Sequence, residues 1–291
     1  MNKISFKHIK SIALLAVLLL ATLSSCAPSK FGGLALYTVR DAMNADAKGT
    51  LQKVADAGYK NIEAAGYADG KFYNMTPTDF KALLNEMKLN PISTHQGTVT
   101  LENADAMIAD VKAAGFEYFV IPVPPMGMFT FDQSTMTMGM NGTIEELTEI
   151  LTTLGEKCNA QGLKLLYHNH DFDFKKNEDG ITPIDYLLEN TNPEYVNFEM
   201  DLYWVTKAGA DPIAYFKKYP GRFKEWHVKD MDEQGRFAPV GTGTIDFKGL
   251  LAEKKLSGMK YYFVEQDRTF TMEPLEAIKV SHEGLKEIGF K

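Results

Sequence analysis

Cysteine is almost absent from this chain: its 291 residues include only Cys26 and Cys158. We expect Cys26 to be consumed by lipid modification, for reasons given below. Cys158 is then the only free thiol, so no intrachain disulfide is possible even in an oxidising compartment.

Long apolar runs, low-complexity tracts and runs of like charge are also missing after residue 26. No proline- or glycine-rich linker divides the chain. The remaining 266 residues are enough to bury one large core. A chain of this length fits a single α/β barrel domain as well as it fits two smaller domains.

Positive charge is in deficit. The formal charge is −7, and it becomes −10 if a leader containing Lys3, Lys7 and Lys10 is removed. An acidic surface repels a phosphodiester backbone, so nucleic acid is a poor candidate partner. A dinucleotide fingerprint is missing too, because the segment from Val240 to Asp246 holds two glycines and lacks the third.

The N-terminal segment has the features of an export signal. Three lysines precede an apolar run over 12–23, followed by Ser24, Ser25 and Cys26. The run is short for a membrane span. Leu-Ser-Ser-Cys resembles a bacterial lipobox, which implies a signal peptide over 1–25, lipidation of Cys26, a tether over 26–31 and a domain over 32–291. The alternative is an ordinary signal peptide in which Cys26 occurs by chance. We predict a membrane-anchored lipoprotein, on the periplasmic side.

Strand-like and helix-like segments alternate along the rest of the chain. The spacing is about thirty residues, which is typical of a parallel sheet. Glycines at helix ends, such as Gly58 and Gly115, add C-cap signals. Eight such units predict an α/β fold, a (β/α)8 TIM barrel. The strands are expected near 33–38, 61–65, 91–95, 117–122, 164–168, 196–201, 223–228 and 260–265.

Four metal-type side chains end the last four predicted strands: His168, Asp201, His227 and Glu265. The carboxyl ends of barrel strands meet at one face, so these side chains are expected to converge. Imidazole and carboxylate groups are ligands of divalent cations. A shared metal centre is therefore favoured over four unrelated buried residues.

Strand alternation adds a second set of residues to this face. Residues two apart share a side, which places His170 with His168, Lys229 with His227 and Asp267 with Glu265. Trp204 and Trp226 have the opposite parity. Both tryptophans are expected to pack in the core.

Several segments together resemble the sugar phosphate isomerase/epimerase group of the xylose isomerase-like TIM barrels. They are LALYTVRD, AGYKNIEAAGY, LYHNHDFDF, MDLYWVTKAGADP, FKEWHVKDM, VGTGTIDF and FVEQD. The resemblance spans residues 32–291. It implies one divalent cation (Mn²⁺, Co²⁺, Zn²⁺ or Mg²⁺) on strands five to eight, and a polyol or keto-sugar substrate that loses a proton next to its carbonyl.

The resemblance also implies roles for individual residues. Asp201, His227 and Glu265 fall on ligand positions, and His168 replaces a glutamate that doubles as acid/base in ketose epimerases. Which of His168 and His170 meets the metal stays open, although the alignment favours His168. Glu265, His170 and Lys229 are the catalytic candidates. Glu63, His95 and Arg268 are predicted to bind the substrate.

The predicted activity is isomerisation or epimerisation of a sugar through an enediolate. Elimination from a 3-keto-glycoside by a lyase is a close alternative, and a non-catalytic sugar-binding lipoprotein is a third; an oligomer is possible with each. Few cationic residues flank the motifs beyond Arg40, Lys229 and Arg268, which favours an unphosphorylated sugar. The long segment 123–142 is expected to form a lid, or an apolar surface for a partner or membrane.

We predict that Cys26→Ser releases the protein from the membrane without unfolding the barrel, because the thiol would carry the anchor. Cell fractionation measures the release, and circular dichroism of the released protein measures whether the barrel is folded. Unchanged membrane association of the variant would contradict the lipoprotein assignment.

Overall fold

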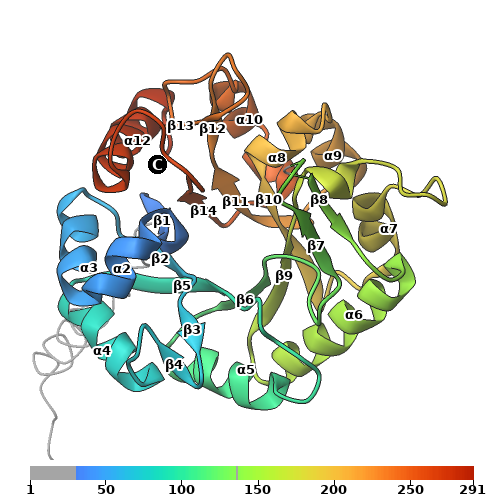
Figure 1. Cartoon of the computed structure of the whole chain (residues 1–291), viewed down its shortest axis with the longest axis horizontal. Coiled ribbons are helices and arrows are strands. Elements are labelled where there is room, and N and C mark those ends of the chain that lie inside the picture. The colour runs from blue at the N-terminus through green and yellow to red at the C-terminus, as the bar shows by residue number, and fades with distance from the viewer. Residues whose placement is uncertain (1–30, 136) are drawn as a thin grey trace, which may run out of the picture.

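The chain folds as a closed barrel of eight parallel strands, in the order β1-β14-β11-β10-β9-β6-β5-β2 (Figure 1). This computed structural model describes residues 31–135 and 137–291. The barrel strands are β1 (Gly33–Ala35), β2 (Asn61–Ala64), β5 (Asn90–His95), β6 (Tyr118–Ile121), β9 (Lys164–His168), β10 (Val196–Asp201), β11 (Phe223–Val228) and β14 (Tyr261–Val264).

The predicted TIM barrel is therefore confirmed, and all eight expected strands are present. The first strand is shorter than predicted. Leu36–Val39 forms a 3-10 helix, η1, because the chain turns over the rim of the barrel directly after Ala35. Gly58 and Gly115 both have positive φ angles where α3 (Ala47–Asp56) and α5 (Ala104–Ala113) end, as the C-cap signals indicated.

A ring of helices covers the outside of the barrel (Figure 1). Helix α6 shows the pattern: its N-cap Thr143 accepts from the Glu146 amide, and Leu147, Leu151 and Leu154 are buried against the sheet. The helices are α2 (Arg40–Ala45), α3 (Ala47–Asp56), α4 (Pro77–Glu86), α5 (Ala104–Ala113), α6 (Ile144–Ala160), α7 (Pro183–Asn190), α8 (Leu202–Lys207), α9 (Pro212–Lys218), α10 (Phe247–Ala252), α11 (Lys254–Ser257) and α12 (Pro274–Ile288).

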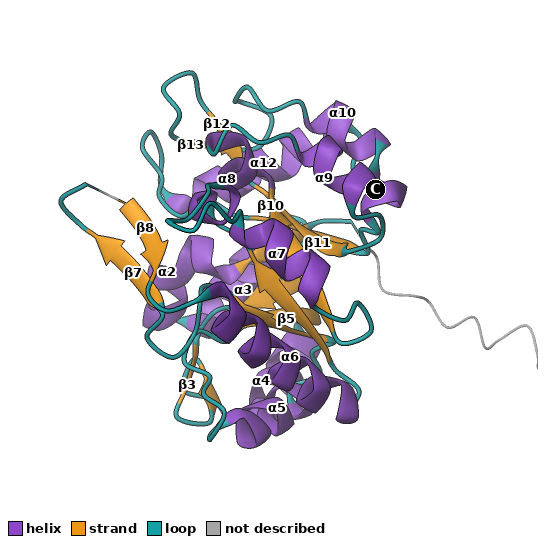
Figure 2. Ribbon diagram, turned by 90° about the vertical axis from the view of Figure 1, so that its right-hand side faces the viewer, coloured by secondary structure: helices purple, strands orange, loops and turns teal. Residues whose placement is uncertain are grey.

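Three short antiparallel pairs extend the loops outside the barrel. They are β3 (Tyr67–Ala68) with β4 (Lys71–Phe72), β7 (Phe129–Asp132) with β8 (Thr137–Met140), and β12 (Asp230–Met231) with β13 (Phe237–Ala238). Figure 2 shows the β7–β8 hairpin projecting from the body of the molecule. The segment 123–142 thus contains regular structure, and whether it closes as a lid remains a prediction.

The interior of the barrel is divided between apolar and polar strands. An apolar cluster is formed by side chains of β1, β5, β6, β9 and β14, namely Ala35, Ile92, Tyr118, Val120, Leu166, Tyr261 and Phe263. None of its members comes from β2, β10 or β11. Those three strands contribute buried Glu63, Glu199 and Glu225 instead. The barrel therefore holds carboxyl groups in a place that hydrophobic side chains usually fill.

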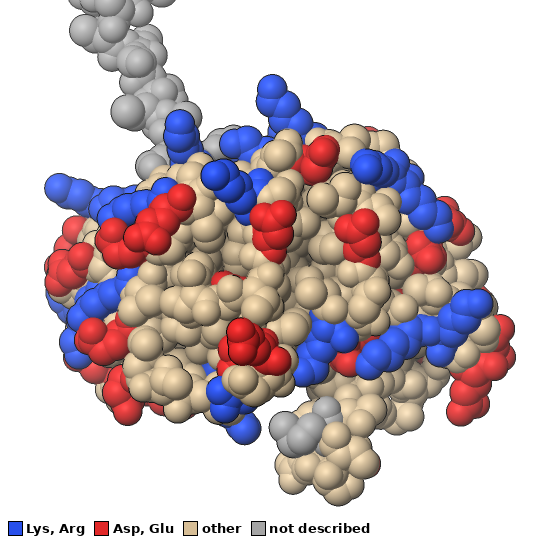
Figure 3. Space-filling model, turned by 90° about the horizontal axis from the view of Figure 1, so that it is seen from above, with Lys and Arg blue, Asp and Glu red and all other residues tan. Residues whose placement is uncertain are grey.

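The predicted signal peptide, the lipidation site Cys26 and most of the tether lie outside the described residues. Within the described ranges, none of the helices combines the length and the apolar character needed to cross a membrane. Cys158 is buried in α6, and burial raises the pKa of its thiol to about 12. Acidic and basic side chains are mixed over the face seen in Figure 3.

A buried carboxyl group anchors the short 3-10 helix η2 (Asp171–Phe174) that follows β9. Asp173 accepts hydrogen bonds from the Tyr167 hydroxyl at 3.0 Å and from the His170 amide at 2.7 Å. Burial raises the pKa of Asp173 from 3.8 to about 7, although these two donors oppose the shift. The anchor fixes the backbone at His170, beside the predicted metal centre.

The pKa of Asp173 predicts a pH dependence of stability. Between pH 3.8 and about 7 the folded chain keeps a proton that the unfolded chain loses, so stability falls as the pH rises through this range. We expect Asp173→Asn, which cannot ionise, to gain stability relative to wild type by up to about 1.4 kcal/mol per pH unit there. Urea unfolding at several pH values measures the difference. Asp246→Asn, at the exposed cap of α10, is the control. A constant difference would mean that folded Asp173 is already ionised.

Candidate active site

The four predicted metal ligands converge at the end of the barrel where their strands finish. One ligand atom each from His168, Asp201, His227 and Glu265 lies within 4.8 Å of the others. All four side chains are buried, with at most 4% exposed. Asp201 has a double role, because its Oδ1 caps helix α8 by accepting from the Tyr203 and Trp204 amides. Its Oδ2 lies 2.8 Å from the ammonium nitrogen of Lys229.

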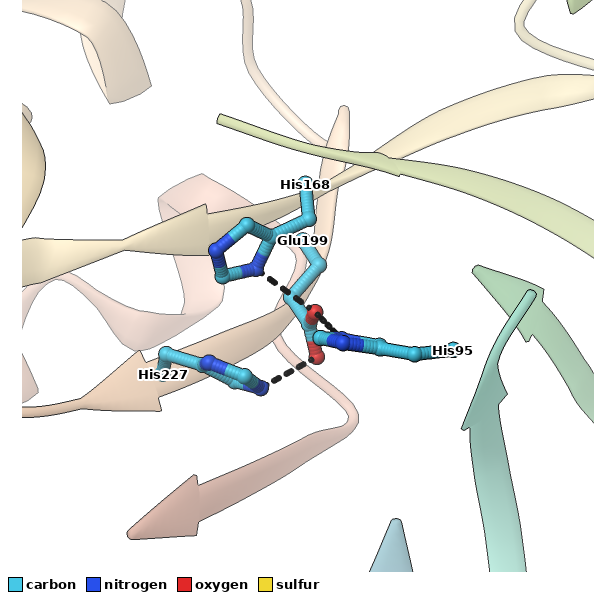
Figure 4. A group of neighbouring side chains, drawn as sticks. All are labelled: His95, His168, Glu199 and His227. Carbon is cyan, nitrogen blue, oxygen red and sulfur yellow. Dashed lines mark hydrogen bonds and ion pairs between the residues drawn. The ribbon is translucent and has the colours of Figure 1, made fainter. Parts of the chain in front are cut away.

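A buried carboxylate that the sequence analysis missed lies beneath the two histidine ligands. Glu199 Oε2 lies 2.9 Å from His168 Nδ1 and 3.1 Å from His95 Nε2, and Glu199 Oε1 lies 3.1 Å from His227 Nε2 (Figure 4). The other nitrogens, His168 Nε2 and His227 Nδ1, lie 3.7 and 3.9 Å from Asp201 Oδ2. A carboxylate behind each imidazole is the usual support of a histidine that binds metal.

Glu63 occupies a different place from the one predicted. It is 1% exposed, does not line the cavity described below, and lies 2.6 Å from His227 Nε2. Ser93 donates to its other oxygen at 2.7 Å. Its position is that of a group that orients His227 rather than one that touches a substrate. The prediction that Glu63 binds the substrate could not take account of its height along the barrel axis.

A third carboxyl group, Glu225, completes this layer. It is fully buried and neither oxygen has a hydrogen-bond partner among the described residues. Burial, followed by the charges of Glu199 and Glu63, raises the pKa of Glu225 well above its usual range, so we expect it to be protonated. The signal for both missed residues was present: Glu199 and Glu225 each lie two positions before a ligand on the same strand. The alternation of strand residues was used only for positions that follow each ligand toward the loops, and not for positions that precede it inside the barrel.

Lys229 carries a positive charge into the centre. Its Nζ lies 2.8 Å from Asp201 Oδ2, 2.6 Å from Glu265 Oε2 and 2.9 Å from Asp267 Oδ1. Burial opposes the charge, but the three carboxylates outweigh it and raise the pKa of Lys229 well above its usual range. Lys229 is therefore expected to keep its proton and to carry a positive charge next to these carboxylates.

The charge states of the ligands fit a divalent cation. Burial disfavours a charged His227, but Glu199, Glu265 and Glu63 outweigh it and raise the pKa of the imidazole well above normal. A divalent cation bound to His227 in place of the imidazole proton would be stabilised by the same three carboxylates. Asp201 and Glu265 already contact the ammonium group of Lys229, so the pair is arranged to receive positive charge.

His170 lies beside this centre and has the character of a neutral imidazole. Burial, followed by His168 and Lys229, lowers its pKa well below 6.5. Its Nδ1 is buried and has no hydrogen-bond partner in the described part of the chain. The ring is 5.0 Å from that of His168 and 5.5 Å from that of Trp204. His170 is thus a candidate proton acceptor adjacent to the ligands, as its parity predicted.

The centre opens into a cavity of 740 Å³. His95, His168, His170, Glu265 and Asp267 lie along its wall, and Arg268 lines it as well. Eight aromatic side chains also line it: Tyr37, Tyr67, Phe129, Phe131, Tyr203, Trp204, Phe237 and Phe270. Small-molecule sites combine apolar and aromatic contacts with a few polar groups in this manner.

The expectation for Trp204 was wrong, whereas Trp226 is fully buried as predicted. Strand β10 ends at Asp201 and helix α8 begins at Leu202, so strand parity no longer applies at Trp204. Segment 123–142 contributes Phe129, Phe131 and Met138 to the cavity. Lys207 and Arg236 also line it, beside Arg40 and Arg268, so more positive charge surrounds the cavity than the motifs indicated.

Comparison with known proteins identifies relatives along most of the chain. An inosose dehydratase of Mesomycoplasma hyopneumoniae (strain 7448) is 24% identical over 277 residues, which cover 80% of this chain and 88% of that protein. An inosose dehydratase of Clostridium tetani is 31% identical over 144 residues, 42% of this chain and 47% of that protein. In the latter match, and in a Salmonella agona relative matched over 40% of its length, this chain spans less than half of the relative.

Solved structures give the same result for the fold. A sugar phosphate isomerase/epimerase from Parabacteroides distasonis superposes with a TM-score of 0.75 at 25% identity, over 92% of this chain and 98% of that one. An L-ribulose 3-epimerase has a TM-score of 0.66 at 14% identity, over 88% and 95%, which indicates the fold alone. The sequence model of the family described as Xylose isomerase-like TIM barrel matches residues 51–288, and the chain therefore belongs to this family, which includes sugar-modifying enzymes.

Proposed function

We propose that the protein is a metal-dependent enzyme that removes the proton next to the carbonyl group of a keto-sugar or keto-polyol. The observation that carries this proposal is the position of His170, whose Nδ1 has no partner among the described residues, beside four convergent ligand atoms. His170 lines the cavity together with two of the four ligand residues, His168 and Glu265. The family and the names of the relatives agree with a carbohydrate substrate.

His168, Asp201, His227 and Glu265 would hold one divalent cation, either Mn²⁺, Co²⁺, Zn²⁺ or Mg²⁺. When bound, the cation supplies positive charge that polarises a carbonyl group and makes the neighbouring C–H bond more acidic. Glu199 and Glu63 orient the two imidazoles from below. Lys229 adds positive charge next to Asp201 and Glu265.

The chain's own residues divide the proton transfer between them. His170 accepts the proton from the carbon next to the carbonyl, and the C–H electron pair moves onto the carbonyl oxygen. Lys229, which retains its proton, balances the negative charge that develops there. Aromatic side chains around His170, among them Trp204 and Phe129, limit the access of water.

Elimination is the outcome that we favour from this intermediate. Epimerisation requires proton donors and acceptors on both faces of one carbon. Here Glu265 is assigned to the cation and also lies 2.6 Å from Lys229 Nζ, which leaves His170 as the free acceptor among the described ligand-side residues. The relatives named inosose dehydratase agree with a lyase. Isomerisation or epimerisation, the first expectation from the sequence, is the alternative that the experiments distinguish.

The substrate would be an unphosphorylated sugar met outside the cytoplasm, consistent with the proposed export and lipid anchor at Cys26. Asp171 and Asp267 line the same cavity as the four cationic side chains. Arg40 donates to the Tyr37 and Asp267 carbonyls, and Arg236 pairs with Asp232. These cations are thus partly used within the protein, which favours a neutral sugar over a phosphorylated one.

The metal proposal predicts a clean loss of binding in Asp201→Asn. The amide keeps the Oδ1 that caps α8 but lacks the negative Oδ2, so the fold remains while stoichiometric metal is lost. Elemental analysis and calorimetric titration with Mn²⁺, Co²⁺ and Zn²⁺ measure binding. Asp211→Asn, at the cap of α9, is the matched control. Full metal occupancy in Asp201→Asn would refute the ligand assignment.

The proton-transfer proposal predicts that His170→Ala retains metal and loses turnover by about 10²–10⁴-fold, the contribution of one general acid–base group. Incubation of keto-sugars in D2O, followed by NMR, should show exchange at the carbon next to the carbonyl in wild type only. An unsaturated product identifies a lyase, and a rearranged sugar identifies an isomerase. If His170→Ala loses metal while His168→Ala keeps it, the roles of the two histidines are reversed.

A further inference from the structure

Exposed aromatic rings are concentrated at the mouth of the cavity. In the described part of the chain six large hydrophobic side chains are exposed, and the aromatic ones among them are Tyr37 (40%), Phe131 (46%) and Phe270 (46%). All three line the cavity, whereas the aliphatic ones do not. Rings left in water around a concave site indicate contact with a ligand.

One wall of the cavity leads from the candidate base to the mouth along strand β7. Phe129 lies 6.4 Å from the ring of His170. Phe131 is two residues farther along the same strand, so it shares the face of Phe129. Figure 2 shows that this hairpin extends away from the barrel. Phe131 therefore continues the wall beyond the reach of the catalytic groups.

The opposite wall has the same character. Trp204 lies 5.5 Å from the ring of His170, and Phe237 lies 5.6 Å from that of Trp204. At the mouth the guanidinium of Arg236 lies 5.2 Å above the ring of Phe270. The two walls together form an aromatic passage that starts at His170 and ends in solvent.

The passage is larger than the proposed reaction needs. A volume of 740 Å³ lies in the upper part of the range of about 300–1,000 Å³ found for sites of drug-sized ligands. A single hexose has only about a dozen non-hydrogen atoms and would leave the outer rings without contact. The outer part of the cavity thus has room for a second ring.

We propose that the outer aromatic passage is a subsite for the leaving group of a glycoside, either a second sugar ring or an aromatic aglycone. This proposal rests on the proposed elimination. With a keto group at C3 of the inner sugar, the C2 proton goes to His170 and the C1–O bond breaks. Its electron pair stays on the glycosidic oxygen, which takes the proton from His170 and departs as an alcohol or phenol. His170 is thereby restored as a neutral imidazole. An unsaturated keto-sugar remains.

The same chemistry places the enzyme in a sequence of reactions. The step consumes a glycoside that already carries the keto group, so no oxidant is needed in this site. A separate oxidation of a glycoside hydroxyl must supply the substrate.

The test compares Phe131→Ala and Phe270→Ala with Leu101→Ala, an equally exposed apolar residue outside the cavity. Michaelis constants are measured for the methyl and 4-nitrophenyl 3-keto-β-glucosides and for 3-keto-cellobiose. Binding of the non-keto 4-nitrophenyl glucoside and of cellobiose is measured by calorimetry, which needs no turnover. We expect both Phe variants to raise the ratio of the nitrophenyl or cellobiose KM to the methyl KM about tenfold, and Leu101→Ala to leave it unchanged.

The outcomes separate this proposal from the proposed function. Equal ratios in all proteins, together with turnover, would overturn the subsite and retain the elimination. Absence of turnover with every keto-glycoside, together with binding of the non-keto ligands that is lost in both Phe variants, would overturn the elimination and support the passage as a ring-binding site. Neither turnover nor binding would overturn both. A response to the nitrophenyl but not the cellobiose ligand assigns the passage to aromatic aglycones.

Discussion

The candidate centre depends on a carboxylate inside the barrel, Glu199, which is placed among three imidazoles. Burial disfavours its charge, but His227, His168 and His95 outweigh burial and lower the pKa of Glu199 well below its usual range. One negative charge thus fixes the ring orientation of two proposed ligands. Its location on β10, two residues below Asp201, couples the ligand layer to the core. A barrel filled only with aliphatic side chains would leave those histidines free to rotate.

The groups of the candidate centre are arranged in layers along the barrel axis. Carboxyl groups of Glu63, Glu199 and Glu225 lie in the interior, the four ligand atoms lie above them, and the aromatic cavity opens above the ligands. These charged groups are buried, with little water around them. Burial strengthens each electrostatic interaction and makes the loss of any one charge partner costly. Lys229 compensates part of this negative charge from the loop side. The candidate ligands are therefore preorganised by the buried carboxyl groups and Lys229. Substrate selection would then depend on the aromatic walls of the cavity.

The loops connect this chemistry to the fold. Asp230 accepts from the backbone amides of Gly241 and Gly243 at 2.9 Å each, and so folds the segment after β11 over the barrel. A side chain at Gly243 would meet Asp230 Oδ1 at 2.3 Å, which explains the glycine at that position. This segment carries Arg236 and Phe237 into the cavity wall. A motif that looks like part of a nucleotide fingerprint thus stabilises the loop that lines the candidate site.

The sequence by itself determined the barrel, its eight strands and the convergence of His168, Asp201, His227 and Glu265, because periodicity and parallel topology place strand ends together. It also placed His170 and Lys229 correctly by parity. Only the tertiary structure decided how deep in the barrel each inward-facing residue lies. Glu63 lies below the ligands, and Glu199 and Glu225, which the sequence analysis missed, lie beside it. The tertiary structure also places Trp204 in the cavity wall, because the chain changes from strand to helix just before this residue. Alternation specifies a face of a strand, whereas height along the barrel axis and the course of the loops depend on contacts between residues far apart in the sequence.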